Sequence, residues 1–167
     1  NNGLASFDGN EVKFFGHKEA DITSMWSSSI SLLNSIEDRK GNLYVVTISG
    51  PTYYFDTKKG RADYLKISSN NLNNYIPQPY SDIYIENDTS LWLARYNGKF
   101  LHYETSSQKT TYYAITEEES SFKNIVTCIR SDSRSKELLW LATKNGIYSF
   151  HTKSGKLQRN FQCHNVK

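Results

Sequence analysis

Short apolar and aromatic stretches alternate with polar turns along this chain, and no window carries apolar residues at helical spacing. Each stretch has the length and the β-branched or aromatic composition of a strand. Gly41 and other turn residues separate the stretches and suit tight connections. One unit of the chain is therefore expected to be a four-stranded antiparallel meander. Its expected strands are Leu32–Ile36, Leu43–Ile48, Thr52–Phe55 and Ala62–Ile67.

The same unit recurs along the whole chain. Tyr44, Trp92 and Trp140 follow one another at intervals of 48 residues. Two other sets of landmarks keep this interval to within one residue. They are the glycines Gly3, Gly50, Gly98 and Gly146 and the aromatic residues Phe7, Phe55, Tyr103 and Phe150.

Four-stranded units that repeat every 40 to 50 residues or so are typical of β-propeller blades. A blade buries both of its faces against neighbours, which explains why inner strands such as Leu138–Ala142 are almost continuously apolar. A parallel β-helix is the main alternative, but its coils are usually shorter and lack these aromatic hairpins. We therefore expect an all-β fold, a partial β-propeller of about three and a half four-stranded antiparallel blades.

The repeat also predicts the organisation of the chain. Residues 1–167 are expected to form a single partial propeller, with a half blade at 1–16 and blades at 29–68, 79–116 and 124–163. Closed propellers have about 4 to 8 blades, so the expected partners are the remaining blades of a parent propeller. Because open strand edges are a liability, self-association into a homodimer through exposed blade faces is the alternative.

The strand-turn-strand residues of these units resemble the two-component regulator propeller repeat. Tyr44 stands where that repeat has Trp, and Val46, Ala94 and Ala142 replace its small Gly. The resemblance rests on Ile36-Glu37-Asp38, Gly41, Leu43-Tyr44-Val45-Val46-Thr47 and Phe55-Asp56, on Leu139-Trp140-Leu141-Ala142-Thr143, Gly146-Ile147 and Phe150, and on Gly3-Leu4-Ala5-Ser6-Phe7-Asp8-Gly9.

Such repeats typically build the periplasmic sensor region of hybrid two-component systems. In these proteins one polypeptide joins extracytoplasmic propellers to a membrane helix, a histidine kinase, a receiver and a DNA-binding region. The resemblance implies that this chain is a periplasmic sensor segment of an inner-membrane protein and that it responds to a glycan-derived ligand. The alternative is a non-catalytic propeller scaffold that only presents a surface for protein contacts.

Composition and motifs narrow the function further. Of the 167 residues, 37% are hydrophobic and 22% are charged, which fits a folded domain, and the dispersed net charge of +3 argues against nucleic acid as a partner. No apolar run is long enough to span a membrane, and no direct membrane contact is expected. The chain has no nucleophile-elbow, P-loop or dinucleotide motif, and we expect no catalytic residue, cofactor or metal in this segment.

The histidines and cysteines are expected to be structural. His102 and His151 are interpreted as exposed polar residues on blade surfaces, because no histidine has metal-ligand spacing to a second ligand. Cys128 falls on the first strand of its blade and Cys163 follows the fourth, with two strands between them, so no disulfide between them is expected.

A candidate ligand site follows from strand direction. Consecutive strands are antiparallel, so the connections between blades and the loops from second to third strands share one axial face. An aromatic ring there would contact sugar CH groups, and Arg, Lys and Asn would bind hydroxyls or a carboxylate. A purely structural role for Trp26, capping the core of a neighbouring blade, stays open. The candidate residues are Trp26, Arg95, Tyr96, Asn97, Lys144 and Asn145.

Overall fold

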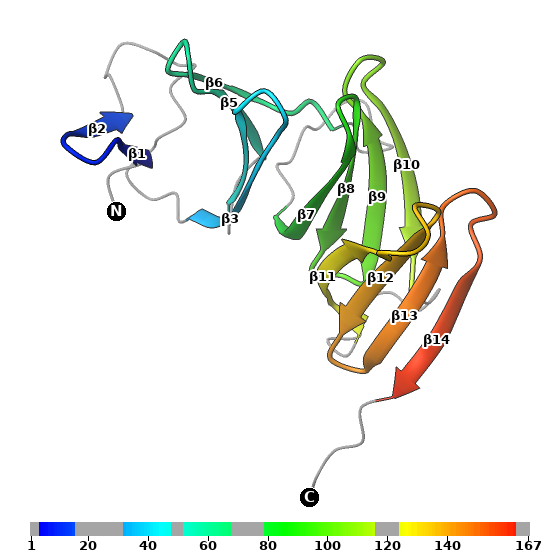
Figure 1. Ribbon diagram of the computed structural model, residues 1–167. Helices are drawn as coiled ribbons and strands as arrows, with labels where there is room; N and C mark the ends of the chain where they lie inside the picture. The colour runs from blue at the N-terminus through cyan, green and yellow to red at the C-terminus, as the bar shows by residue number, and fades with distance from the viewer. Residues whose placement is uncertain (1–3, 16–31, 48–51, 68–78, 116–123, 163–167) are drawn as a thin grey trace, which may run out of the picture. The chain divides into compact units, whose positions relative to one another are not determined.

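The computed structural model describes residues 4–15, 32–47, 52–67, 79–115 and 124–162. These residues form four antiparallel sheets and no α-helix (Figure 1), so the all-β expectation is confirmed. The chain divides into two compact units, one made of residues 1–66 with 77–79 and the other of residues 67–76 with 80–167. Each unit is described by itself.

The first unit contains a hairpin and a four-stranded sheet. The strands follow one another in the sheet in chain order, which confirms the predicted meander. The fourth strand ends at Tyr64, earlier than expected, although the Leu65 N–H still donates to the Thr52 carbonyl at 2.8 Å. Leu4 packs against Phe55 and Ala62 of the sheet. The strands are β1 (Leu4–Phe7) and β2 (Val12–Phe15) in the hairpin, and β3 (Leu32–Glu37), β4 (Leu43–Thr47), β5 (Tyr53–Asp56) and β6 (Arg61–Tyr64) in the sheet.

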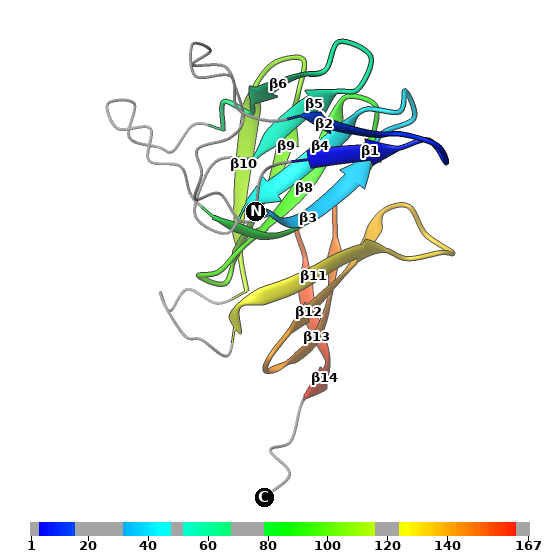
Figure 2. The ribbon, with the colours of Figure 1, turned by 90° about the vertical axis from the view of Figure 1, so that its left-hand side faces the viewer.

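The second unit consists of two four-stranded sheets. Each sheet is again a meander in chain order, and β11 packs against β7 and β8. Figure 2 shows the strong twist of the last sheet, in which β11 crosses the direction of β14. The strands are β7 (Tyr80–Asn87), β8 (Ser90–Arg95), β9 (Lys99–Glu104) and β10 (Lys109–Ala114), then β11 (Val126–Ser131), β12 (Leu138–Thr143), β13 (Gly146–His151) and β14 (Leu157–Gln162).

An aromatic core joins the two sheets of the second unit. The Phe150 ring meets Trp92 edge-on at 5.5 Å between centroids and Phe100 at 5.0 Å. Such edge-to-face contacts stabilise beyond the area that they bury. The buried core residues are Trp92, Ala94, Phe100 and Ile115 from the first sheet and its exit, and Val126, Ile129, Leu139, Leu141, Tyr148 and Phe150 from the second.

A buried carboxylate adds a polar joint between these sheets. The Asp82 side chain is 3% exposed, and its Oδ2 accepts hydrogen bonds from the Ile129 N–H at 2.9 Å and from Arg130 Nη1 at 2.6 Å. Ser81, beside Asp82 at a register shift in β7, donates from its Oγ to the Val126 carbonyl. A bulge of this kind changes the direction in which side chains point, and here it accompanies bonds from the first strand of one sheet to the first strand of the next.

The joint predicts unequal effects for its two charged residues. Asp82→Ala leaves the Ile129 N–H without its acceptor and should lower the free energy of unfolding by about 2–4 kcal/mol. Arg130→Ala should cost less, because Asp82 keeps the Ile129 N–H as a donor and the Arg130 side chain is 57% exposed. Urea denaturation followed by tryptophan fluorescence measures both. Equal losses for the two variants would contradict the joint.

Candidate functional site

The structure places five of the six candidate ligand residues, and Trp26 lies outside the described residues. Arg95 ends β8, Tyr96 and Asn97 lie in the turn to β9, and Lys144 and Asn145 form the turn from β12 to β13. In Figure 1 the arrows of β8 and β12 point toward the same end of the second unit.

Two residues that flank the sheets, Ile115 after β10 and Asn124 before β11, lie against the β8–β9 turn. The Ile115 N–H donates to the Gly98 carbonyl at 3.0 Å, and a Cβ on Gly98 would lie 3.2 Å from Asn124. Gly98 has a φ of 75°, so its lack of a side chain serves both the turn and this close approach. The structure thus brings the β8–β9 turn together with Ile115, just after β10, and Asn124, just before β11. Among the described residues, no hydrogen bond joins the β8–β9 turn to the β12–β13 turn.

Arg95 has an aromatic environment. Its guanidinium carbon lies 6.0 Å from the centroid of the Tyr80 ring, at the outer limit of a cation–π contact. Burial raises the pKa of Tyr112, and the positive charge of Arg95 opposes that rise. Tyr96 is 40% exposed beside this half-buried cation. The turn therefore presents a positive charge and a ring surface together.

The backbone of both turns is held by local hydrogen bonds. The Lys99 N–H donates to Asn97 Oδ1 at 3.3 Å. In the other turn the Asn145 N–H donates to Thr143 Oγ1 at 3.1 Å, and that hydroxyl donates to the Gly146 carbonyl at 3.0 Å. Lys144 is exposed between these groups. Asn97 is thus engaged in its own turn, whereas the Tyr96 ring and the Lys144 side chain are exposed.

Three carboxylates lie at equivalent places in the sheets, and the sequence analysis named only one of them, Asp38, as part of the repeat motif. Each lies two residues beyond the first-strand residue that pairs with the large aromatic residue of the second strand. The pairs are Ile36 with Tyr44, Tyr84 with Trp92 and Arg130 with Trp140. The carboxylates are therefore Asp38, Glu86 and Asp132. We call them the strand-end carboxylates.

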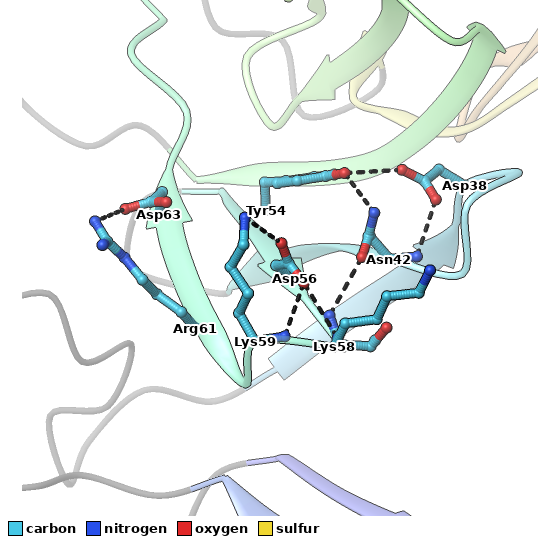
Figure 3. Close-up of polar contacts among 9 residues, drawn as sticks. Asp38, Asn42, Tyr54, Asp56, Lys58, Lys59, Arg61 and Asp63 are labelled. Carbon is cyan, nitrogen blue, oxygen red and sulfur yellow. Dashed lines mark hydrogen bonds and ion pairs between the residues drawn. The ribbon is translucent and has the colours of Figure 1, made fainter.

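In the β3–β6 sheet this carboxylate organises a polar network, shown in Figure 3. Asp38 accepts the N–H groups of Lys40 at 2.8 Å and Asn42 at 2.9 Å, and the Tyr54 hydroxyl at 3.1 Å. Burial alone would raise the pKa of Asp38, but the Asn42 and Lys40 donors hold it below its ordinary value. The Asp56 turn nearby repeats the pattern, with N–H donors from Lys58 and Lys59.

In the β7–β10 sheet a histidine takes the place of the tyrosine. His102 Nε2 lies 3.0 Å from Glu86 Oε2, and Ser90 Oγ donates to the same oxygen at 3.1 Å. The His102 ring lies 4.7 Å from Trp92 between centroids, and its side chain is 20% exposed. The expectation that His102 is an exposed surface residue is wrong, because this bond and ring contact hold it against the sheet.

In the β11–β14 sheet the second-strand tryptophan itself donates to the strand-end carboxylate. Trp140 Nε1 donates to Asp132 Oδ2 at 2.9 Å, and the N–H groups of Arg134 and Ser135 donate to the other carboxylate oxygen. The Trp140 bond is the main reason that the pKa of Asp132 is lowered. Ser149 occupies the position of the ring found in the other sheets.

The strand-end carboxylates are suited to holding turns rather than to acid–base chemistry. Their oxygens already accept donors from the same sheet, and such donors favour the charged form. Among the described residues no three His, Cys, Asp or Glu side chains group as metal ligands would. His151 differs from His102, because its Nε2 lies 3.6 Å from Glu137 Oε2 and its side chain is 42% exposed. Cys128 is a free thiol in the structure.

The Glu86 pair predicts a pH dependence. Hydrogen bonding to His102 lowers the pKa of Glu86, against the opposing effect of burial. The contribution of ionised Glu86 to the free energy of unfolding is therefore complete above the unfolded pKa of about 4.3. It is lost as the pH falls through the pKa of Glu86 in the folded protein. Glu86→Gln should lower the free energy of unfolding at pH 6 and make its decline below about pH 4.3 less steep. Urea titrations across this range test it, with the exposed turn residue Asp88→Asn as control. Parallel pH curves for wild type and Glu86→Gln would contradict the assignment.

Comparison with known proteins gives fold relatives only. No protein-family model matches the sequence, and no curated protein matches it. Among solved structures, the extracellular domain assigned to hybrid two component system BT3049 from B. thetaiotaomicron matches with a TM-score of 0.68 and 14% identity, over 88% of this chain and 19% of that one.

Two structures of the extracellular domain of BT4673 from B. thetaiotaomicron also match. One, assigned to a one component system, has a TM-score of 0.70 and 17% identity over 100% of this chain and 20% of that one. The other, assigned to a hybrid two component system, has a TM-score of 0.56 and 12% identity over 79% of this chain and 16% of that one. The chain thus spans about a fifth of the length of these structures. Within the described ranges it has no helix long and apolar enough to cross a bilayer. Its fold is similar to that of extracellular domains of bacterial two-component systems.

Proposed function

We propose that this chain is a segment of the extracytoplasmic sensor of a hybrid two-component signalling protein. The observation that carries the proposal is the likeness of fold to extracellular domains assigned to hybrid two component systems, over 88% of the chain for BT3049 and 79% for one structure of BT4673. The BT4673 structure assigned to a one component system matches over 100% of the chain. In this proposal the segment is periplasmic, the parent is an inner-membrane histidine kinase, and the segment itself is not an enzyme. The repeat resemblance in the sequence supports the same assignment independently.

The finer architecture that we propose is part of a β-propeller. Three four-stranded meanders with a register shift near the start of each first strand support three blades, and the β1–β2 hairpin supports a half blade. The remaining blades of the parent complete the ring. Trp92 and Ala94 of β8 are buried in one core with residues of the β11–β14 sheet, as expected for a strand covered by a neighbouring blade.

The ligand that we propose is a glycan fragment bound at the axial end of the propeller. Arg95 and Tyr96 support this because they are consecutive residues that supply a guanidinium and a partly exposed ring, groups suited to a sugar acid. Lys144 from the neighbouring sheet adds an exposed cation at the same end. Trp26, Asn97 and Asn145 complete the set.

Binding to the intact ectodomain tests the ligand. A mixture of uronic-acid oligosaccharides should bind, and Arg95→Ala should weaken binding about tenfold or more, as loss of a charge-assisted bond would. The same substitution should weaken the binding of a mixture of neutral oligosaccharides less. Titration calorimetry measures the affinities, with Lys109→Ala on the exposed start of β10 as the matched control. Equal affinities of Arg95→Ala, Trp26→Ala and wild type for both mixtures would remove the site.

The coding sequence on either side of this segment distinguishes the sensor hypothesis from the scaffold hypothesis. A downstream membrane helix followed by histidine-kinase motifs is expected for a sensor. A secretion signal with no kinase would instead favour a propeller that only presents a surface to other proteins.

A further inference from the structure

The first strand of the β7–β10 sheet contains an extra residue, Ser81, close to Arg95. Tyr80 pairs with Arg95. The next pair is Asp82 with Ala94, so the register skips Ser81. Arg95 and Ala94 are consecutive and therefore point to opposite faces of the sheet. Since cross-strand partners share a face, Tyr80 and Asp82 lie on opposite faces too, whereas residues two apart in a regular strand share one.

The bulge at Ser81 therefore gives β7 a contact on each face. On one face, the guanidinium carbon of Arg95 lies 6.0 Å from the centroid of the Tyr80 ring. Toward the next sheet, the Ser81 hydroxyl and the Asp82 carboxylate bind backbone groups of β11. Because one extra residue sets the direction of the side chains on either side of it, the two contacts depend on the same backbone conformation.

The ring and the cation are particular to this sheet. The first strands of the other two sheets also have register shifts, but the equivalent pairs are Leu32 with Thr47 and Val126 with Thr143. Both threonines are buried, and the Thr143 hydroxyl donates to a carbonyl of its own turn. Arg95, which is half-buried, replaces this threonine with a group suited to binding carboxylates.

We propose that the Ser81 bulge couples the binding of an anionic glycan at Arg95 to the contact between β7 and β11. The proposal rests on the proposed function, since the anion is the sugar acid assigned to Arg95, and it adds how that site is regulated. The bulged conformation places Tyr80 beside the guanidinium and is held by the bonds to β11. A ligand that binds this conformation more tightly strengthens those bonds, and loss of the bonds weakens ligand binding by the same factor. Occupied and empty sites therefore differ in how firmly β7 and β11 are joined.

Substitution of Ser81 tests the coupling, because its hydroxyl points to β11 and not to Arg95. In the intact ectodomain, Ser81→Ala should lower the affinity for the uronic-acid oligosaccharide mixture about threefold, the size expected for loss of a cation–π contact. The affinity for the neutral mixture should not change. Ser81→Thr keeps the hydroxyl and should keep the wild-type affinity. Ser149→Ala removes a comparable hydroxyl bond, to Asn160 at 2.9 Å, and is the matched control in titration calorimetry.

Hydrogen exchange followed by mass spectrometry tests the reciprocal effect. The Ile129 N–H donates to Asp82 and reports the contact between β7 and β11. The His151 N–H donates to the Lys156 carbonyl at 2.9 Å, in the β13–β14 turn, and reports general stability. The uronic-acid mixture should slow exchange at Ile129 about threefold and leave His151 unchanged. Without ligand, Arg95→Thr, which introduces the residue of the other two sheets, should speed exchange at Ile129 by a similar factor.

Three results would overturn the coupling. Wild-type affinity of Ser81→Ala, together with weaker binding by Arg95→Ala, would show that the site does not depend on the bulge. Equal losses in Ser81→Ala and Ser149→Ala would show a general loss of stability. Equal exchange at Ile129 in ligand-free wild type and Arg95→Thr would show that Arg95 does not act on β11. Failure of the wild type to bind either mixture would remove the proposed ligand instead, and the ligand-free exchange rates would still decide whether Arg95 acts on β11.

Discussion

The constraint that governs the second unit is that inner strands of its four-stranded sheets carry apolar residues on both faces, and each such face is stable only when it is covered. β8 is buried at five consecutive positions from Ser90 to Ala94, whereas β12 alternates between half-buried and buried residues. The two strands are equivalent in register and similar in sequence, so their difference reflects what lies against them. Stability therefore resides in the contacts between sheets as much as in any one sheet, as in other repeat proteins.

With both faces apolar, polar groups concentrate at the ends and edges of the sheets. The strand-end carboxylates Asp38, Glu86 and Asp132 bind the backbone or side-chain donors of their own turns and, in each sheet, one ring donor. The ring differs each time, being Tyr54, His102 or Trp140 itself. The repeat thus preserves a hydrogen bond to a carboxylate while exchanging the residue that donates it. Asp82 is not a strand-end carboxylate and differs from them, because its donors belong to the next sheet.

Much of the fold could be predicted from the sequence because the period and the turn residues act locally. The strands of the first sheet were predicted to within a few residues, as was their order. The strand-end carboxylates were not, because the longer turn between β11 and β12 displaces Asp132 from the 48-residue interval, and strand pairing is needed to align it with Glu86. The environment of His102 was missed because its partners lie on two other strands. The position of Arg95 and Lys144 at one end of their sheets followed from strand direction, whereas what they bind depends on chemistry that the strand pattern does not encode.

The Asp82 joint has a consequence for biosynthesis. A ribosome releases the β7–β10 sheet before β11 exists, so during that interval Trp92 faces solvent and the Asp82 carboxylate has neither the Ile129 N–H nor Arg130 to bind. Hydrophobic surface that is exposed in this way favours aggregation and chaperone capture. Arrival of β11 brings the two donors and the first apolar cover in a single step. The β11–β14 sheet thus protects the sheet made before it, and translation order sets the direction in which this pair of sheets closes.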